Sequence, residues 1–220
     1  MYTDANKIIS EVANSPKIIE IFNGLKSLLE EEQKKRQHFH ETVKEDQKAE
    51  FINGEVIIHS PVKFKHAMGS DLLFTYLRVY LGKTKLGFVG HEKLMIQLTR
   101  NDYEPDICFF LKEKSRAFNP DQMLFPAPDF VVEVTSPSTE KTDRTIKFDD
   151  YEAHGVKEYW IIDPEKEFVE QYILEDGKYD LRVKSGNGII SSPVIDGFEI
   201  PIRAIFDEKL LNETIADLVS

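Results

Sequence analysis

Acidic residues stand at the start of one short apolar run and inside another, in the middle of this chain. Asp106 precedes the run 107–110, and Glu133 lies inside the run 130–134, where valines flank it. Both runs have the length and composition of buried strands. Burying a carboxylate in an apolar strand is costly unless a positive charge compensates it, and a divalent cation with oxygen ligands can do so. The pair therefore predicts a metal site between two strands.

Lys147 is a candidate positive charge for the same place. The segment 142–154 is predicted to be a helix with Phe148 and Tyr151 on its inward face, and Gly155 ends it. Lys147 precedes Tyr151 by one helical turn, so it lies beside the inward face rather than opposite it. We expect its side chain to approach the two carboxylates.

A second Pro-Asp pair offers an alternative to Asp106. Asp129 follows a proline, as Asp106 does, and it lies four residues before Glu133. On an ideal strand these two side chains point to the same face but lie about 13 Å apart, which is too far to share one metal ion directly. Asp106, from a neighbouring strand, is therefore the better partner, although a carboxylate at its position can also simply end a loop.

Composition and length indicate one globular domain with an appendage. The 220 residues are 41% hydrophobic and 30% charged, no apolar run approaches the roughly 18 residues of a membrane span, and the N-terminus lacks the pattern of a secretory signal. The net charge of −11 argues against a broad basic surface for nucleic acid. It allows a nuclease, because a metal bound by acidic residues can neutralise phosphate. The single cysteine, Cys108, suits a buried strand and a cytoplasmic protein.

Residues 1–47 are predicted to be a helical extension, separate from the domain at 48–220. One helix from about 16 to 46 fits the sequence, as does the same stretch with a break near 37–40, and His38 and His40 are expected to be solvated. Four apolar side chains recur at helical spacing and form one stripe: Ile18, Phe22, Leu25 and Leu29. This stripe must pack either on the domain or on the same helix of a second subunit. We expect a homodimer.

The rest of the chain alternates strand and helix signals. Asn53-Gly54 predicts a hairpin over 49–59. Apolar periodicity predicts a helix at 64–81, and the loop 113–127 is polar and contains proline. The predicted fold is an α/β core with a mixed sheet, flanked by the helices near 64–81 and 142–154. Four strand regions should share that sheet: 86–98, 104–112, 129–135 and 158–163.

Several segments of the chain resemble a known family. The segments E-F-I-N-G-E-V, E-P-D-I-C-F-F, P-D-F-V-V-E-V-T-S-P-S-T, K-F-D-D-Y and G-V-K-E-Y-W-I-I-D-P are similar to the Uma2 family, also called DUF820. The resemblance covers about residues 49–185 and is most specific over 127–164. It implies the restriction-endonuclease-like PD-(D/E)XK fold for 48–220. The family is widespread in cyanobacteria.

The resemblance also implies a function and a set of site residues. The function is a Mg²⁺- or Mn²⁺-dependent endonuclease that hydrolyses phosphodiester bonds of DNA. Asp106 and Glu133 match the metal-binding acids, and the lysine of the general pattern is replaced by Thr135, so that Lys147 on the following helix matches the family's lysine. His66 matches a further recurrent position, as does one hairpin carboxylate, for which the alternatives are Glu50 and Glu55.

Two functional classes remain open from the sequence. In the first, the chain is a nuclease in which the metal polarises the phosphate and lowers the pKa of bound water, while Lys147 orients the attacking water or stabilises the developing charge. In the second, it is a catalytically inactive module with the nuclease fold that acts through protein partners or oligomerisation. Retention of both acidic residues favours the first class, whereas the displaced lysine and the acidic surface favour the second.

Overall fold

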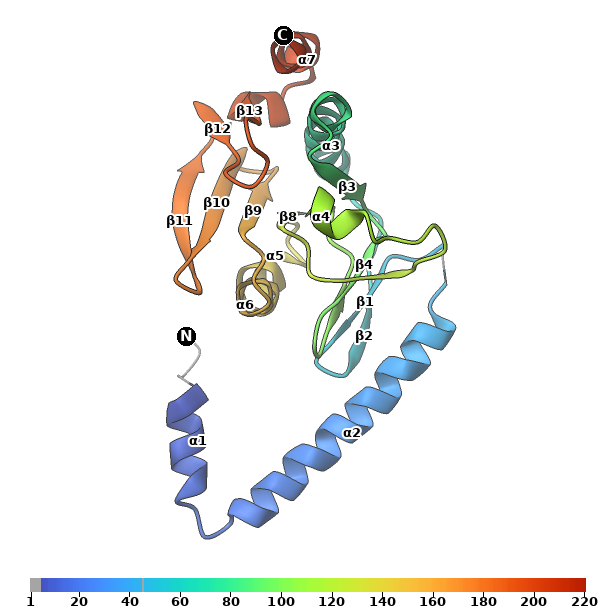
Figure 1. Ribbon diagram of the computed structural model, residues 1–220, viewed down its shortest axis with the longest axis vertical. Helices are drawn as coiled ribbons and strands as arrows, with labels where there is room; N and C mark the ends of the chain where they lie inside the picture. The colour runs from blue at the N-terminus through green and yellow to red at the C-terminus, as the bar shows by residue number, and fades with distance from the viewer. Residues whose placement is uncertain (1–4, 45) are drawn as a thin grey trace.

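The computed structural model describes residues 5–44 and 46–220, and of residues 5 and 6 only the backbone. The undescribed residues 1–4 and 45 fall within the predicted N-terminal helical extension. A six-stranded mixed sheet forms the centre of the fold, and a five-stranded sheet lies beside it (Figure 1). No helix in the described part of the chain is both long enough and apolar enough to cross a membrane.

The six-stranded sheet has the strand order β11-β10-β9-β8-β6-β3, with β8 and β9 parallel and the other neighbours antiparallel. It contains strands from all four predicted regions, which confirms the predicted mixed α/β core. Its strands are β3 (Gly87–His91), β6 (Ile107–Leu111), β8 (Phe130–Val134), β9 (Glu158–Asp163), β10 (Phe168–Glu175) and β11 (Lys178–Ser185).

The second sheet has the order β2-β1-β5-β4-β7. The predicted hairpin forms β1 and β2, with Asn53 and Gly54 both at positive φ in its turn. The predicted strand region 86–98 is divided, because Glu92 and Lys93 both adopt positive φ and separate β3 from a strand of this second sheet. The strands are β1 (Ala49–Ile52), β2 (Glu55–Ile58), β4 (Met95–Gln97), β5 (Asp102–Tyr103) and β7 (Leu124–Phe125).

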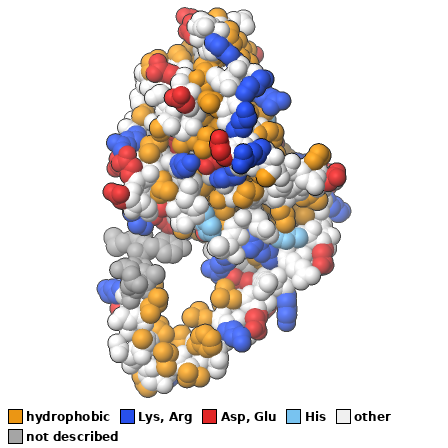
Figure 2. All heavy atoms as spheres, in the orientation of Figure 1, with side chains coloured by type: hydrophobic (Ala, Val, Ile, Leu, Met, Phe, Trp, Pro, Cys, Tyr) orange, Lys and Arg blue, Asp and Glu red, His pale blue; other side chains and the backbone are white. Residues whose placement is uncertain are grey.

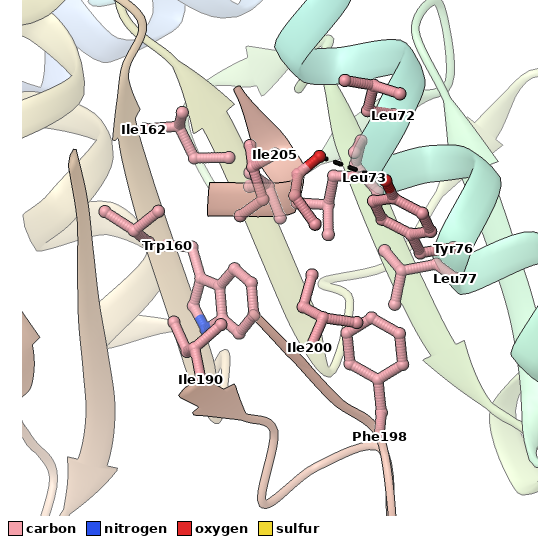
Figure 3. Close-up of a cluster of buried hydrophobic side chains, with 14 of the residues drawn as sticks. Leu72, Leu73, Tyr76, Leu77, Trp160, Ile162, Ile190, Phe198, Ile200 and Ile205 are labelled. Atoms are coloured by element: carbon pink, nitrogen blue, oxygen red, sulfur yellow. Dashed lines mark hydrogen bonds between the residues drawn. The ribbon is translucent and has the colours of Figure 1, made fainter. Parts of the chain in front are cut away.

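Both faces of the central strands are buried. Helix α3 (Phe64–Thr84) covers one face, where it packs against alternate residues of β6, β8 and β9. Tyr76 of this helix donates a hydrogen bond from its hydroxyl to the carbonyl of Ala204 at 3.1 Å (Figure 3). The other residues of the same strands pack against Tyr151 and the second sheet. Val132 and Val134 lie on the face covered by α3, so the side chain of Glu133, which stands between them in the strand, points to the other face, toward Tyr151.

The predicted helix at 142–154 is a continuous helical segment with a π turn inside it. It consists of α5 (Glu140–Thr142), the π turn η1 (Asp143–Lys147) and α6 (Phe148–Ala153). A π turn adds a residue to the helical repeat and is often found at functional sites. Asp143, Lys147 and Tyr151 are all buried along this segment.

The N-terminal helices form an arm that extends away from the sheets (Figure 1). They are α1 (Ala5–Ala13) and α2 (Ile18–Thr42), so the unbroken form of the predicted helix is the one observed. The end of α2 is fixed to the core by Asp102, which accepts hydrogen bonds from Arg36 on both carboxylate oxygens, at 2.6 and 2.7 Å, and lies 2.8 Å from His40 Nε2. The expectation of a solvated His40 is therefore wrong, because the sequence did not reveal its acidic partner.

The remaining elements complete the edge of the core. They are α4 (Lys112–Ser115), β12 (Ile189–Ser191), β13 (Glu199–Pro201), the 3-10 turns η2 (Ile202–Ile205) and η3 (Glu208–Leu210), and α7 (Leu211–Val219).

Replacing Arg36 with alanine should destabilise the fold by about 2–4 kcal/mol, because Asp102 is fully buried and would lose its strongest partner. For a chain of this length the melting temperature should fall by roughly 5–15 °C. The control is Lys26→Ala, whose exposed pair with Glu30 contributes little. Equal melting temperatures for the two variants would show that Asp102 does not anchor α2.

Candidate active site

A cavity of about 260 Å³ opens where the end of β8 meets the start of α3. All four site residues predicted from the sequence line it: Asp106, Glu133, Lys147 and His66. Each comes from a different element, since they lie before β6, on β8, in the π turn and in the first turn of α3. All four side chains are buried, with relative exposures of 2–7%.

Asp106 is held by three neighbours. Its Oδ1 accepts a hydrogen bond from Lys48 Nζ at 2.6 Å, and its Oδ2 accepts one from the backbone N–H of Val134 at 2.8 Å and lies 3.4 Å from His66 Nε2. Burial raises the pKa of the Asp106 carboxyl, but the contact with His66 and the charge of Lys48 outweigh it. The pKa therefore lies well below its usual range, and the group is a carboxylate near neutral pH.

Glu133 is in a different electrostatic state. Its Oε1 accepts hydrogen bonds from Lys147 Nζ at 3.0 Å and from the Tyr151 hydroxyl at 2.9 Å. Burial, together with the neighbouring carboxylates of Asp143 and Asp106, raises its pKa to about 8 despite the charge of Lys147. In the absence of a further cation, Glu133 therefore holds a proton at neutral pH.

The ammonium group of Lys147 lies among three carboxylates. Its Nζ is 2.8 Å from Glu50 Oε1, 3.0 Å from Glu133 Oε1 and 3.5 Å from Asp143 Oδ1, and its side chain is only 4% exposed. Burial lowers its pKa, but the three carboxylates more than compensate and raise it well above the ordinary value. Lys147 is thus permanently charged, and it holds together residues from β1, β8 and the π turn.

Glu50 is the hairpin carboxylate that lies at the site. Its Oε1 also accepts from the backbone N–H of Glu104 at 3.0 Å, and its Oε2 lies 3.0 Å from His59 Nε2. Burial raises the pKa of Glu50, but Lys147 and His59 outweigh it and lower the pKa to about 2. Glu55, the alternative from the sequence, is solvent-exposed on β2.

The second Pro-Asp pair has a structural role. Asp129 Oδ2 accepts a hydrogen bond from the backbone N–H of Leu111 at 2.9 Å, and its carboxylate lies 3.3 Å from both Lys114 and Lys157. It does not line the cavity.

Thr135, at the position of the displaced lysine, donates its hydroxyl to the carbonyl of Ile162 at 3.2 Å.

Lys48 and Asp143 are site residues that the sequence analysis missed. Lys48 lies two residues before Glu50, and this spacing along an extended chain gives both side chains the same direction. Asp143 lies four residues before Lys147 in the helical segment. Among the described residues neither carboxylate oxygen of Asp143 has a hydrogen-bond partner, and Lys147 Nζ lies 3.5 Å from its Oδ1 as an ion pair. Both spacings were visible in the sequence, but they gain meaning only once the hairpin and the helix are known to meet.

The donor atoms and the charge of the cluster fit a divalent cation. Four buried carboxylates, those of Glu50, Asp106, Glu133 and Asp143, face two ammonium groups, those of Lys48 and Lys147. If all six groups were ionised and the histidines neutral, the excess would equal the charge of one such ion. Carboxylate oxygens are the ligands that Mg²⁺ and Mn²⁺ prefer. As described over 5–44 and 46–220, however, no three His, Cys, Asp or Glu side chains are arranged to hold one ion.

The same fold occurs in a solved structure with a related description. That structure, described as "a putative nuclease belonging to DUF820 from Anabaena variabilis ATCC 29413", matches with a TM-score of 0.66 at 18% sequence identity, over 76% of this chain and 94% of that chain. None of the curated proteins compared with the chain matches it. The match places this chain in the fold class of that nuclease-like structure.

The family is shown by a longer and more direct match. The model of the Uma2 family, described as "Putative restriction endonuclease", matches residues 36–203. The chain belongs to the Uma2 family, which confirms the resemblance seen in the sequence. The match begins at Arg36, the residue that anchors α2, whereas the projecting part of the arm lies outside it.

Proposed function

We propose that this chain is a metal-dependent endonuclease that hydrolyses phosphodiester bonds of DNA, with Mg²⁺ or Mn²⁺ held by Asp106 and Glu133. The observation that carries the proposal is the buried cluster, in which the four carboxylates of Glu50, Asp106, Glu133 and Asp143 face the two ammonium groups of Lys48 and Lys147. Burial, together with the neighbouring carboxylates, raises the pKa of Glu133 in this cluster to about 8. A structural ion-pair cluster of this kind would normally balance its charges, because an unpaired buried carboxylate is costly. A buried carboxyl group with a strongly raised pKa at a cavity is a mark of a functional site.

The residues around the two carboxylates would have distinct roles in such a reaction. A divalent cation at Asp106 and Glu133 would polarise the phosphate and lower the pKa of a water molecule. His66 and the backbone N–H of Val134 fix the Asp106 carboxylate, and Lys147 and the Tyr151 hydroxyl fix the Glu133 carboxylate. The charge of Lys147 also favours the negative charge that develops on the phosphate.

A non-catalytic module is the second candidate, and one observation favours it. Lys48 and Lys147 already satisfy oxygens of Asp106 and Glu133, as they would in a nuclease fold that had lost its metal. Such a module would act through protein partners or through oligomerisation.

A cleavage assay separates the two candidates. Supercoiled plasmid and single-stranded DNA are incubated with the purified chain in Mg²⁺, in Mn²⁺ and in EDTA. The proposal expects nicking or degradation with a metal and none with EDTA, and the Asp106→Asn variant, which removes one proposed ligand, should be inactive. No cleavage of either substrate under any condition would favour the inactive module.

We further propose that the chain forms a homodimer through the arm. Hydrophobic side chains gather where α1 and α2 meet (Figure 2), and they include the whole predicted stripe at exposures of 38–60%: Ile18, Phe22, Leu25 and Leu29. Exposed apolar surface of this kind marks an interaction site. A second copy presents the same surface, so a two-fold pairing covers both at once.

Light scattering tests the dimer directly. At micromolar concentration the chain should have twice the mass of one subunit, and the double variant Phe22→Glu, Leu25→Glu should have the mass of one subunit because it places charges in the contact. The control, Glu20→Gln with Lys26→Gln, changes exposed polar residues of the same helix and should leave the mass unchanged. A wild-type monomer would refute the proposal.

A further inference from the structure

Among the lysines that line the cavity, Lys48 combines partial exposure with a buried carboxylate partner. It immediately precedes β1, its side chain is 19% exposed, and it lines the cavity beside Asp106. Asp106 Oδ1, at 2.6 Å, is the one hydrogen-bond partner that the described residues give its ammonium group. An ammonium group has three N–H donors, so this contact leaves Lys48 able to bind a further acceptor.

Lys147 has no N–H donor left for a further acceptor. Its three donors face three carboxylates at 2.8, 3.0 and 3.5 Å, and its side chain is 4% exposed. Binding a phosphate oxygen would require it to release one of these buried carboxylates, which would then lie uncompensated. Lys147 is therefore placed to position Glu50 and Glu133 rather than to contact a substrate.

The two lysines at the rim of the cavity are also poorly suited. Lys63 and Lys65 are 73% and 56% exposed, and both pair with Glu165, at 3.5 and 3.1 Å. Such pairs are well hydrated and hold no fixed geometry. Among the lysines that line the cavity, only Lys48 is both fixed by a buried partner and open to the space that a ligand would occupy.

We propose that Lys48 is the residue that binds the phosphate group of the substrate, and that Lys147 is a positioning residue. This assignment rests on the proposed phosphodiester hydrolysis and adds a catalytic residue to it. The acceptor is a phosphodiester oxygen, an anion that a lysine binds as a point charge. When it binds, Lys48 can turn from Asp106 toward the phosphate, and a divalent cation held by Asp106 and Glu133 would then compensate the Asp106 carboxylate.

The assignment implies that Lys48 and a cation compete for Asp106, because both are attracted to the same carboxylate. Removing the ammonium group should therefore have two effects of opposite sign. The affinity for Mn²⁺ should rise, since its competitor is gone, while the affinity for DNA and the rate of hydrolysis should fall. A residue with a merely structural role would lower all three together.

The test compares Lys48→Met with Lys65→Met, a control that removes a rim lysine of the same cavity. Mn²⁺ alone is titrated in thermal melts, and a fluorescein-labelled oligonucleotide is titrated in EDTA, where no cleavage occurs. We expect Lys48→Met to lower the half-saturating Mn²⁺ concentration at least about threefold, to weaken oligonucleotide binding about tenfold, and to slow single-turnover cleavage about a hundredfold. Lys65→Met should change each quantity less than about threefold, and Lys48→Arg should restore part of the DNA binding.

The outcomes separate this inference from the proposed function. If the wild type cleaves DNA and Lys48→Met cleaves and binds it equally well, the assignment of Lys48 is overturned while the nuclease stands. If the wild type cleaves no DNA, and its binding of the oligonucleotide still depends on Lys48, the proposed hydrolysis fails and the phosphate contact stands. If Lys48→Met does not fold, Lys48→Gln, which keeps an N–H donor for Asp106, replaces it in the same titrations.

Discussion

The Glu133→Gln variant should be more stable than the wild type at pH 8 and should show no melting shift with Mn²⁺. The pKa of Glu133 is raised to about 8 in the folded chain, from an ordinary value of 4.5. A group whose pKa is raised by folding contributes stability that is complete below pH 4.5 and is lost as the pH rises to about 8. Glutamine resembles the protonated acid at every pH, so the variant does not lose this stability.

The expected size of the effect is large. Each unit of pKa shift corresponds to about 1.4 kcal/mol, so the wild type should lose up to roughly 4–5 kcal/mol from this group between pH 4.5 and 8. The difference in melting temperature, variant minus wild type, should therefore grow over this range to about 10 °C. The control is Glu55→Gln, which changes an exposed carboxylate of the hairpin and should follow the wild type. A Glu133→Gln protein that melts below the wild type at pH 8 and still responds fully to Mn²⁺ would place the metal site elsewhere.

Replacing Lys147 with methionine should have the largest destabilising effect of any single change at the site. The substitution leaves the buried carboxylates of Glu50, Glu133 and Asp143 without their shared ammonium group. Breaking a buried ion pair in this way costs about 3–5 kcal/mol. We expect the melting temperature to fall by about 10 °C or more, and hydrolysis to fall with it because Glu133 loses its orientation.

Metal should partly reverse this loss. A divalent cation supplies the positive charge that Lys147 no longer provides, and a ligand that binds only the folded state stabilises it by mass action. The Mn²⁺-induced melting shift should therefore be larger in Lys147→Met than in the wild type. Lys157→Met, which removes a half-exposed partner of Asp129, is the matched control and should melt within a few degrees of the wild type. An unchanged melting temperature in Lys147→Met would mean that Lys147 does not compensate buried negative charge in this cluster.

Those parts of the fold that depend on local sequence signals were predictable. The turn at Asn53-Gly54 needs residues that tolerate positive φ, and both residues adopt it. The apolar runs of β6, β8 and β9 are buried on both faces, which is why they appear as continuous hydrophobic stretches in the sequence. The burial of Glu133 inside such a run was visible for the same reason.

Features that depend on contacts between distant segments were not predictable in the same way. The π turn places Asp143 and Lys147 inward together, but nothing in the local residue types distinguishes it from an ordinary helical turn. The division of 86–98 into two strands depends on positive φ at Glu92 and Lys93, which are not typical turn residues. The role of Lys48 depends on its contact with Asp106, 58 residues away in sequence.

One calorimetric measurement tests the central claim that the cavity is completed by a single divalent cation. Mn²⁺ is titrated into the wild type and into Glu133→Gln at pH 7, in two buffers whose ionisation enthalpies differ. We expect one Mn²⁺ per chain in the wild type, with release of about one proton because the cation would displace the proton of Glu133, and no such release in the variant. Absence of saturable Mn²⁺ binding by the wild type, or binding with the same proton release in Glu133→Gln, would contradict it.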